Sequence, residues 1–221
     1  MKTAVVIGAT GLIGISLSTG LAERSEYAQV LTILRKQAVW TNKKIKNIHF
    51  DFLNWDQLLA QIKNFSSGSD IDFFCALGTT MKIAGSDASF KKIDHDFVVE
   101  FARLAKMLNA NKLVVVSSLG ADKNSNIFYN KTKGEMETEV IGICGDTAAI
   151  VRPSLLLGDR IEFRITEKLF SMAAAAFNFF LLGPLKKFKP IQAKQVAKAM
   201  IQIAQNKKAD QFFENDQLFY F

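Results

Sequence analysis

The chain has 221 residues, of which 49% are hydrophobic and 22% are charged, and its formal net charge is +7. This is ordinary globular usage, and one α/β domain of this length buries a full core without disulfide or metal staples. Cys75 and Cys144 are the only cysteines, with no CxxC spacing or neighbouring histidine. We therefore expect reduced, buried thiols, no metal site and a cytoplasmic protein.

The positive charge would suit a nucleic-acid or membrane partner. However, the lysines are scattered and no basic run reaches five residues, which favours a solvated surface and no nucleic-acid partner. The apolar run 169–183 is shorter than the roughly 20 residues of a membrane span, so no integral membrane segment is expected. Lys186, Lys187 and Lys189 follow this run and leave weak peripheral membrane contact open.

The first predicted element is a strand at 3–9, a short apolar run that ends in glycine. Helical spacing follows in 11–25. The start of the chain has one lysine before apolar residues, as signal peptides do, but glycines interrupt the run and no Ala-x-Ala site follows. A buried parallel strand and a turn explain this stretch better.

Strands and helices alternate along the first 160 residues. A long amphipathic helix is predicted at 89–110 and another at 126–142, with Ser125 or Asn126 as its cap. This alternation predicts a doubly wound α/β fold, a parallel sheet with helices on both faces. The predicted strands are 3–9, 30–35, 45–51, 71–78, 112–118 and 147–153.

After residue 160 the pattern changes to two helices, at about 163–182 and 191–206, and an aromatic stretch at 211–221. No linker precedes them, so we expect 1–221 to be a single domain in which 160–221 forms a small, mostly helical cap on the substrate side. Large apolar residues of the first helix fill the core or, alternatively, line a substrate pocket or a dimer interface: Phe163, Phe170, Met172, Phe177, Phe179 and Phe180.

The stretch GATGLIG places Gly8, Gly11 and Gly14 between the first strand and the first helix. Gly8 allows a sharp turn, Gly11 lets backbone N–H groups approach a pyrophosphate, and Gly14 lets the helix pack close to the strand. The positive end of the helix dipole then faces the phosphates. The spacing predicts a dinucleotide site.

Arg35 and Lys36 lie at the end of the second strand, without the acidic residue that would bond an NAD ribose. A guanidinium group can form a forked contact with a 2′-phosphate, so NADP(H) is favoured. Asp51 ends the third strand, where its carboxylate could accept a hydrogen bond from adenine or, alternatively, cap the helix that begins near Asn54.

Tyr129 and Lys133 are four positions apart and share one helical face. Ser117 and Ser118 end the fifth strand, at the edge where open α/β sheets bind ligands. A phenol can exchange a proton with a substrate oxygen, a nearby ammonium group favours the phenolate, and a serine hydroxyl can orient the substrate. These residues predict a catalytic site for hydride transfer at a carbonyl or alcohol.

The GATGLIG loop, the paired serines and Tyr129-x-x-x-Lys133 resemble the short-chain dehydrogenase/reductase superfamily, whose members have an NAD(P)-binding Rossmann fold. The stretches FFCALGTTMKIAGS, SSLGADKNSNIFYNKTKGEME and VRPSLLLGDR are similar to its atypical branch, typified by the Tat-interacting-protein oxidoreductases. The resemblance extends from about residue 3 to 160, and more loosely through KPIQAKQVAKAM.

This resemblance implies catalytic roles for Ser118, Tyr129 and Lys133, with Ser117 as an alternative serine. It also implies that Tyr129 and Lys133 both contact the cofactor, with Lys133 binding the nicotinamide ribose. The residues that it implies for the cofactor NADP(H) are Gly8, Thr10, Gly11, Leu12 and Ile13 at the pyrophosphate, Arg35 and Lys36 at the 2′-phosphate, Asp51 and Phe52 at adenine, Leu77, Gly78 and Thr79 at the ribose, and Pro153, Ser154 and Leu155 at the nicotinamide.

Many members of the superfamily use an asparagine of the preceding helix in a proton relay, and Asp94 aligns with it here. A carboxylate cannot donate as an amide does, so Asp94 and His95 could be ordinary surface residues. The favoured function is an NADP(H)-dependent oxidoreductase, monomeric or homodimeric, for a small apolar substrate. The alternatives are a non-catalytic NADP(H)-binding regulator and an epimerase or isomerase of the nucleotide-sugar type.

Overall fold

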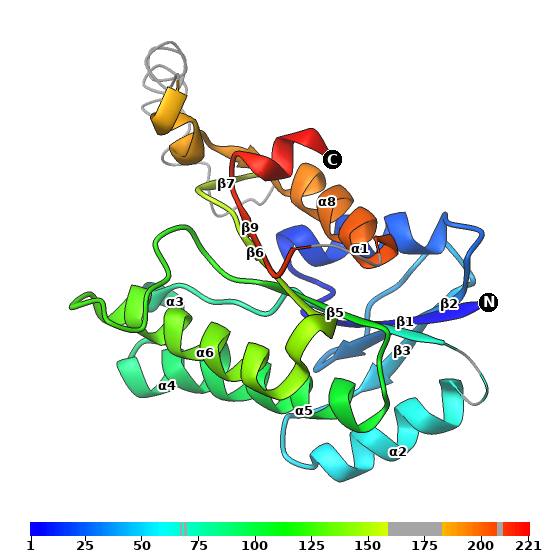
Figure 1. Ribbon diagram of the computed structural model, residues 1–221. Coiled ribbons are helices and arrows are strands. Elements are labelled where there is room, and N and C mark those ends of the chain that lie inside the picture. The colour runs from blue at the N-terminus through cyan, green and yellow to red at the C-terminus, as the bar shows by residue number, and fades with distance from the viewer. Residues whose placement is uncertain (67, 69, 159–182, 207–209) are drawn as a thin grey trace.

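The computed structural model describes residues 1–66, 68, 70–158, 183–206 and 210–221. They form a seven-stranded sheet in the order β3-β2-β1-β4-β5-β6-β9, with every neighbouring pair parallel (Figure 1). This confirms the doubly wound fold. The strands are β1 (Lys2–Ile7), β2 (Tyr27–Leu34), β3 (Ile45–His49), β4 (Ile71–Cys75), β5 (Lys112–Val116), β6 (Ala148–Arg152) and β9 (Phe212–Glu214).

The central strands are buried because helices cover both faces of the sheet. Alternate residues of each strand point to opposite faces, so two neighbouring residues of one strand belong to two different apolar clusters. Val6 of β1 and Phe74 of β4 lie in the first cluster, whereas Val5 and Phe73 lie in the second.

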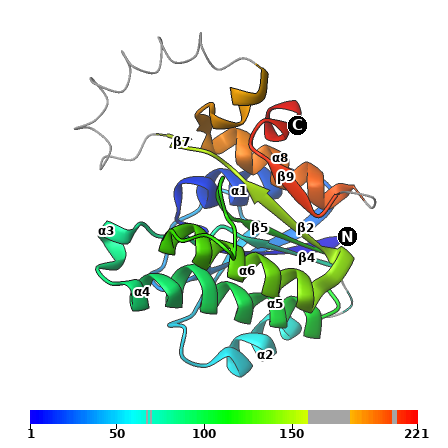
Figure 2. The ribbon, with the colours of Figure 1, turned by 60° about the vertical axis from the view of Figure 1, so that its left-hand side comes forward.

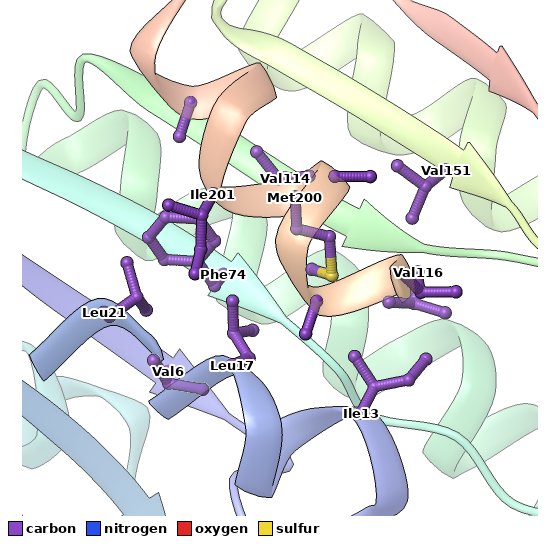
Figure 3. Packing of buried hydrophobic residues seen from close by; sticks show 14 of the residues in the cluster. Val6, Ile13, Leu17, Leu21, Phe74, Val114, Val116, Val151, Met200 and Ile201 are labelled. Carbon is purple, nitrogen blue, oxygen red and sulfur yellow. The ribbon is translucent and has the colours of Figure 1, made fainter. Parts of the chain in front are cut away.

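The first face is covered by α1 (Leu12–Ala22) and α8 (Ala193–Gln205). Figure 3 shows Leu17 and Leu21 of α1 and Met200 of α8 gathered over the strand residues of this face. A Cβ atom on Gly20 would lie 3.0 Å from Ile201 Cδ1, so a glycine here lets the two helices approach closely.

The second face is covered by α2 (Trp55–Ser66), α5 (Phe97–Met107) and α6 (Phe128–Cys144), on the opposite side of the sheet from α1 and α8 (Figure 2). Ile127, not Ser125 or Asn126, occupies the N-cap position of α6. The Ser125 hydroxyl nevertheless accepts a hydrogen bond from Ile127 N (3.1 Å).

The long helix predicted at 89–110 is divided into three parts. They are α4 (Asp87–Lys91), the π-helix η1 (Lys92–Asp96) and α5. A π turn closes i→i+5 hydrogen bonds and therefore shifts the phase of an apolar stripe. Phe101 and Leu104 are buried as expected, whereas three other residues of the predicted stripe are only half-buried: Ile93, Phe97 and Leu108.

Beyond β6 the chain returns to the sheet. α8 packs on α1, and β9, a strand of three residues that was not predicted, extends the sheet beside β6. Residues 159–182, which include the predicted helix at 163–182 and its aromatic residues, lie outside the described residues. The shorter elements are β7 (Leu156–Leu157), β8 (Ile191–Gln192), α3 (Met81–Ala84), η2 (Gly145–Thr147), η4 (Gly183–Phe188) and η5 (Gln217–Tyr220).

Arg152 ties the end of β6 to its neighbours. Its guanidinium group donates to both carboxylate oxygens of Glu137 on α6 (3.0 and 2.5 Å) and to Glu214 on β9 (2.8 Å). The hydrogen bonds to Glu137, and then those to Glu214, raise the pKa of Arg152. This network holds the last strand against the rest of the sheet.

Cys75 and Cys144 are buried free thiols. Among the helices of the described residues, none is both long enough and apolar enough to cross a membrane.

Candidate cofactor and catalytic site

The strand order reverses between β1 and β4, and Gly8 follows β1 at this point. Gly8 has φ +78°, and a Cβ atom on it would lie 2.5 Å from the carbonyl carbon and oxygen of Ala76, just after β4. A Cβ atom on Gly14 would lie 2.1 Å from Gly8 O. Both positions therefore require glycine, and the crevice where open α/β sheets bind ligands opens beside them.

Helix α1 begins in this crevice with Gly11 as its N-cap. Gly11 has no side chain that could cap the helix, and the first turn of α1 holds no acidic residue. Unpaired N–H groups and the helix dipole make such an end a site for anions. Leu12 and Ile13 form the first turn, and Thr10 lies exposed just before it. The predicted pyrophosphate residues are thus together at one helix end.

The predicted adenosine residues follow the next two strands. Arg35 and Lys36 are exposed directly after β2. Asp51 accepts a hydrogen bond from Leu53 N (3.0 Å) and does not cap α2, because that role belongs to Asn54, whose side chain accepts from Gln57 N (2.9 Å).

Phe52 adopts φ +67°, a region that non-glycine residues seldom occupy. Its ring is stacked on Phe97 with centroids 4.4 Å apart, and it also contacts Phe50 and Trp55. These ring contacts hold the Phe52 backbone in its unusual positive-φ conformation, directly after Asp51.

The predicted ribose loop, Leu77 to Thr79, leaves β4 beside the Gly8 turn. Thr79 N donates to Asp94 Oδ2 (2.8 Å), and a Cβ atom on Gly78 would lie 3.6 Å from Asp94 Oδ1. The loop is therefore anchored to the π-helix η1.

Lys133 is buried on α6, one turn after Tyr129, with its side chain 3% exposed. Its Nζ lies 2.7 Å from Asp94 Oδ1, and the Asp94 side chain is 1% exposed. Burial lowers the pKa of Lys133, but the charges of Asp94 and Tyr129 outweigh burial and raise the pKa overall. Lys133 therefore carries a positive charge at neutral pH.

Asp94 and His95 are both buried, so the idea that they are ordinary surface residues is wrong. His95 Nε2 lies 3.2 Å from Glu139 Oε1 of α6, and its Nδ1 lies 2.9 Å from Asp96 Oδ1. Both residues lie in the π-helix η1, which packs against α6. The ion pair of Asp94 with Lys133 was the site interaction that sequence reasoning missed.

Tyr129 is half-buried at the start of α6, and its ring packs against Phe90 with centroids 5.2 Å apart. The loop before α6 crosses the helix closely: a Cβ atom on Gly134 would lie 2.1 Å from Lys123 N, and Asp122 N donates to Asn130 O (3.0 Å). This contact fixes how the loop from β5 enters α6.

Ser117 and Ser118 begin that loop. Both hydroxyl oxygens are buried, and neither has a hydrogen-bond partner within the described residues. Buried hydroxyl groups normally have partners, so these two are available to a ligand.

The loop after β6 contains Pro153, Ser154 and Leu155. Pro153 O accepts from Leu119 N (2.9 Å), which connects this loop to the one that carries Ser118. The Ser154 hydroxyl donates to Lys189 O (2.6 Å), so it already has a structural partner. Leu155 is 40% exposed.

Asn215 is a further structural residue that the sequence did not reveal. It is fully buried, its side-chain oxygen accepts from Ser154 N (2.9 Å), and its amide donates to Lys189 O (2.8 Å).

The turn formed by Gly8, Gly11 and Gly14, and the two serine hydroxyls that lack partners among the described residues, fit a dinucleotide at the carboxyl ends of the strands.

Comparison with curated proteins gives relatives that match most of this chain. Protein FMP52, mitochondrial, from Debaryomyces hansenii is 33% identical over 205 residues, 91% of this chain and 87% of the relative. Protein HTATIP2 from Rattus norvegicus is 33% identical over 163 residues, 74% of this chain and 66% of the relative. No protein-family model matches the chain.

Solved structures share the fold. UDP-N-acetylglucosamine 4-epimerase from Bacillus cereus superposes with a TM-score of 0.70 at 15% identity, covering 96% of this chain and 78% of that one. WbmF from Bordetella bronchiseptica in complex with NAD+ gives 0.66 at 14% identity, covering 99% and 76%. At these identities the likeness shows the Rossmann fold alone.

The relatives contradict the expected cytoplasmic location. The FMP52 relatives from six organisms are all named as mitochondrial proteins. The expectation was wrong because reduced cysteines distinguish reducing from oxidising compartments, and they do not distinguish one reducing compartment from another.

Proposed function

The chain belongs to the family of FMP52 and HTATIP2, an atypical branch of the short-chain dehydrogenases/reductases, and we propose that it is an NADP(H)-dependent oxidoreductase. The carrying observation is the buried ammonium group of Lys133 one helical turn from Tyr129. Directly after β5, the hydroxyls of Ser117 and Ser118 have no hydrogen-bond partner among the described residues. The mitochondrial relatives favour a mitochondrial location for this protein as well.

The cofactor would extend from the N-terminus of α1 toward α6. The N–H groups after Gly11 would bind the diphosphate, because a helix N-terminus stabilises anions. Arg35 and Lys36, exposed after β2, would bind the 2′-phosphate and so select NADP(H) over NAD(H). Asp51 and Phe52 would contact the adenine, and the loop Leu77 to Thr79 would contact a ribose.

When bound, the nicotinamide supplies or accepts a hydride. Tyr129 would donate its phenolic proton to the oxygen of a carbonyl substrate as that carbon is reduced, and would accept the proton in the reverse direction. Lys133 would stabilise the resulting phenolate and bind the nicotinamide ribose. Ser118, or Ser117 in its place, would donate a hydrogen bond to the substrate oxygen and so hold that oxygen near Tyr129.

A small apolar substrate fits the segments that adjoin the site. Met81 of α3 follows the ribose loop and is 37% exposed, and Ile83 is 67% exposed. Ile127 lies two residues before Tyr129 and is 62% exposed, and Leu155 lies in the loop after β6. If these side chains face the bound substrate, they would give the site an apolar wall, as in sites for apolar ligands.

The test has two stages. NADPH and NADH are titrated against the protein by fluorescence, and aldehydes, ketones and quinones are then screened for oxidation of the preferred cofactor. Tyr129→Phe should abolish turnover and leave NADPH affinity near that of the wild type. Tyr220→Phe, at an exposed tyrosine of η5, is the matched control and should keep full turnover.

Wild-type turnover in Tyr129→Phe would exclude the catalytic assignment. A wild-type protein that binds NADPH tightly but reduces none of the compounds, under any condition tested, would favour the regulatory alternative.

A further inference from the structure

We propose that Asp94 is a positioning residue that couples the catalytic lysine to the loop that binds the cofactor ribose; this rests on the proposed function. One carboxylate contacts both parts of the site. Its Oδ1 lies 2.7 Å from Lys133 Nζ, and its Oδ2 accepts a hydrogen bond from Thr79 N (2.8 Å). Each contact uses a different oxygen, so the two can be made at the same time.

The fold supports this coupling. Asp94 lies in the π-helix η1, which joins α4 to α5, and both α4 and α5 run beside α6 in Figures 1 and 2. The same interface holds the contact of His95 with Glu139, and a longer pair, Lys91 Nζ to Glu135 Oε2 (3.7 Å). Asp94 is the member of this row that is almost fully buried, and it is the one directed at Lys133.

The energetic need for Asp94 follows from burial. A lysine that is 3% exposed loses its hydration, which favours the neutral amine. The titratable groups that influence Lys133 are Asp94 on η1, Tyr129 on its own helix and Cys75 at the end of β4. The Cys75 thiol is kept neutral, because burial raises its pKa to about 12. Asp94 is thus the group that compensates the ammonium charge in the protein without cofactor.

An amide at this position would keep the hydrogen bond from Thr79 and lose the charge. Asp94→Asn should therefore lower the pKa of Lys133 below its ordinary value, because burial is no longer opposed by a carboxylate. The unfolded state then binds more protons than the folded state above that lowered pKa. Consequently, the stability of Asp94→Asn relative to that of the wild type should rise with pH above that lowered pKa.

Cofactor affinity should move the other way. If the Lys133 ammonium group binds the ribose, NADPH affinity of Asp94→Asn should fall by up to about tenfold per pH unit above the lowered pKa. If the role of Asp94 were purely structural, the changes in the free energy of unfolding and in NADPH affinity would both be independent of pH. Opposite pH trends in one variant therefore distinguish positioning from packing.

The experiment measures urea unfolding and NADPH fluorescence titrations from pH 7 to 10 for the wild type, Asp94→Asn and Asp96→Asn. Asp96 is the control, because it lies in the same π-helix with a side chain that is 54% exposed. The double variant Asp94→Asn/Lys133→Met removes both charges and should lose the pH trends of the single variant.

The outcomes separate the two hypotheses. Absence of NADPH binding by the wild type would contradict the proposed function. Binding by the wild type with parallel pH profiles in Asp94→Asn would overturn the role of Asp94 alone. If Asp94→Asn does not fold, recovery of folding in the double variant supports charge compensation, whereas failure of both contradicts it.

Discussion

Replacing Gly8 with alanine tests the geometry of the crevice between β1 and β4. Alanine at φ +78° costs about 1–2 kcal/mol relative to glycine. The new Cβ atom would also lie 2.5 Å from the backbone of Ala76, where ordinary contacts begin at 3.4 Å. The two loops would have to separate by about 1 Å, and overpacking of this kind costs about 1–3 kcal/mol.

Gly8→Ala should therefore reduce the free energy of unfolding by about 2–5 kcal/mol, the sum of the two costs. For a protein of this size the melting temperature falls by about 2–4 °C per kcal/mol, which gives about 4–20 °C. NADPH affinity should fall at least about tenfold, or 1.4 kcal/mol, because the widened turn no longer directs the N–H groups of α1 at one point.

Thermal unfolding and NADPH titration measure both effects. Gly142→Ala is the matched control, because Gly142 is exposed on α6 and a Cβ atom on it would meet no described residue outside the adjoining turns of its own helix. It should stabilise the helix by about 0.5–1 kcal/mol. A Gly8→Ala protein that melts like the wild type and binds NADPH as tightly would refute the geometry described for this turn.

Three further predictions follow from individual contacts. Arg35→Ala should weaken NADPH binding about 10–100-fold, the value of a hydrogen bond to a charged group, and leave NADH binding unchanged; equal loss for both cofactors would show a structural arginine. Arg152→Met leaves the carboxylate of Glu137 buried without its partner, so urea unfolding should show a loss of about 3–5 kcal/mol, and an unchanged midpoint would contradict the network. Burial raises the pKa of Cys75 to about 12 from 9.0, so the contribution of this thiol to the free energy of unfolding is complete below pH 9 and is lost between pH 9 and 12. In that window the free energy of unfolding of Cys75→Ala should fall less steeply with pH than that of the wild type, and identical slopes would contradict the raised pKa.

The alternation of strands and helices was predictable because each buried strand is a short apolar run and each covering helix repeats its apolar residues at helical spacing. The glycine turn was predictable for a related reason. Its three glycines carry a spacing that only a close strand-to-helix turn requires, and Gly8 and Gly14 do prevent clashes with backbone atoms.

Other features depend on contacts between distant residues and leave no local pattern. The π-helix η1 interrupts a stretch that reads as one continuous amphipathic helix, so the burial of Asp94 against Lys133 was not foreseen. Phe52 takes a positive φ within an aromatic cluster whose member Phe97 comes 45 positions later in the chain. Strand β9 has only three residues, too few for an alternating pattern to stand out.

The most direct test of the account is a crystal structure of the protein with NADPH. It should show the diphosphate at the N-terminus of α1 beside Gly11, the 2′-phosphate within hydrogen-bond distance of Arg35, and the nicotinamide ribose bonded to Lys133 with Tyr129 facing the reactive ring carbon. An NADPH molecule bound elsewhere, or a Tyr129 hydroxyl directed away from the nicotinamide, would contradict it.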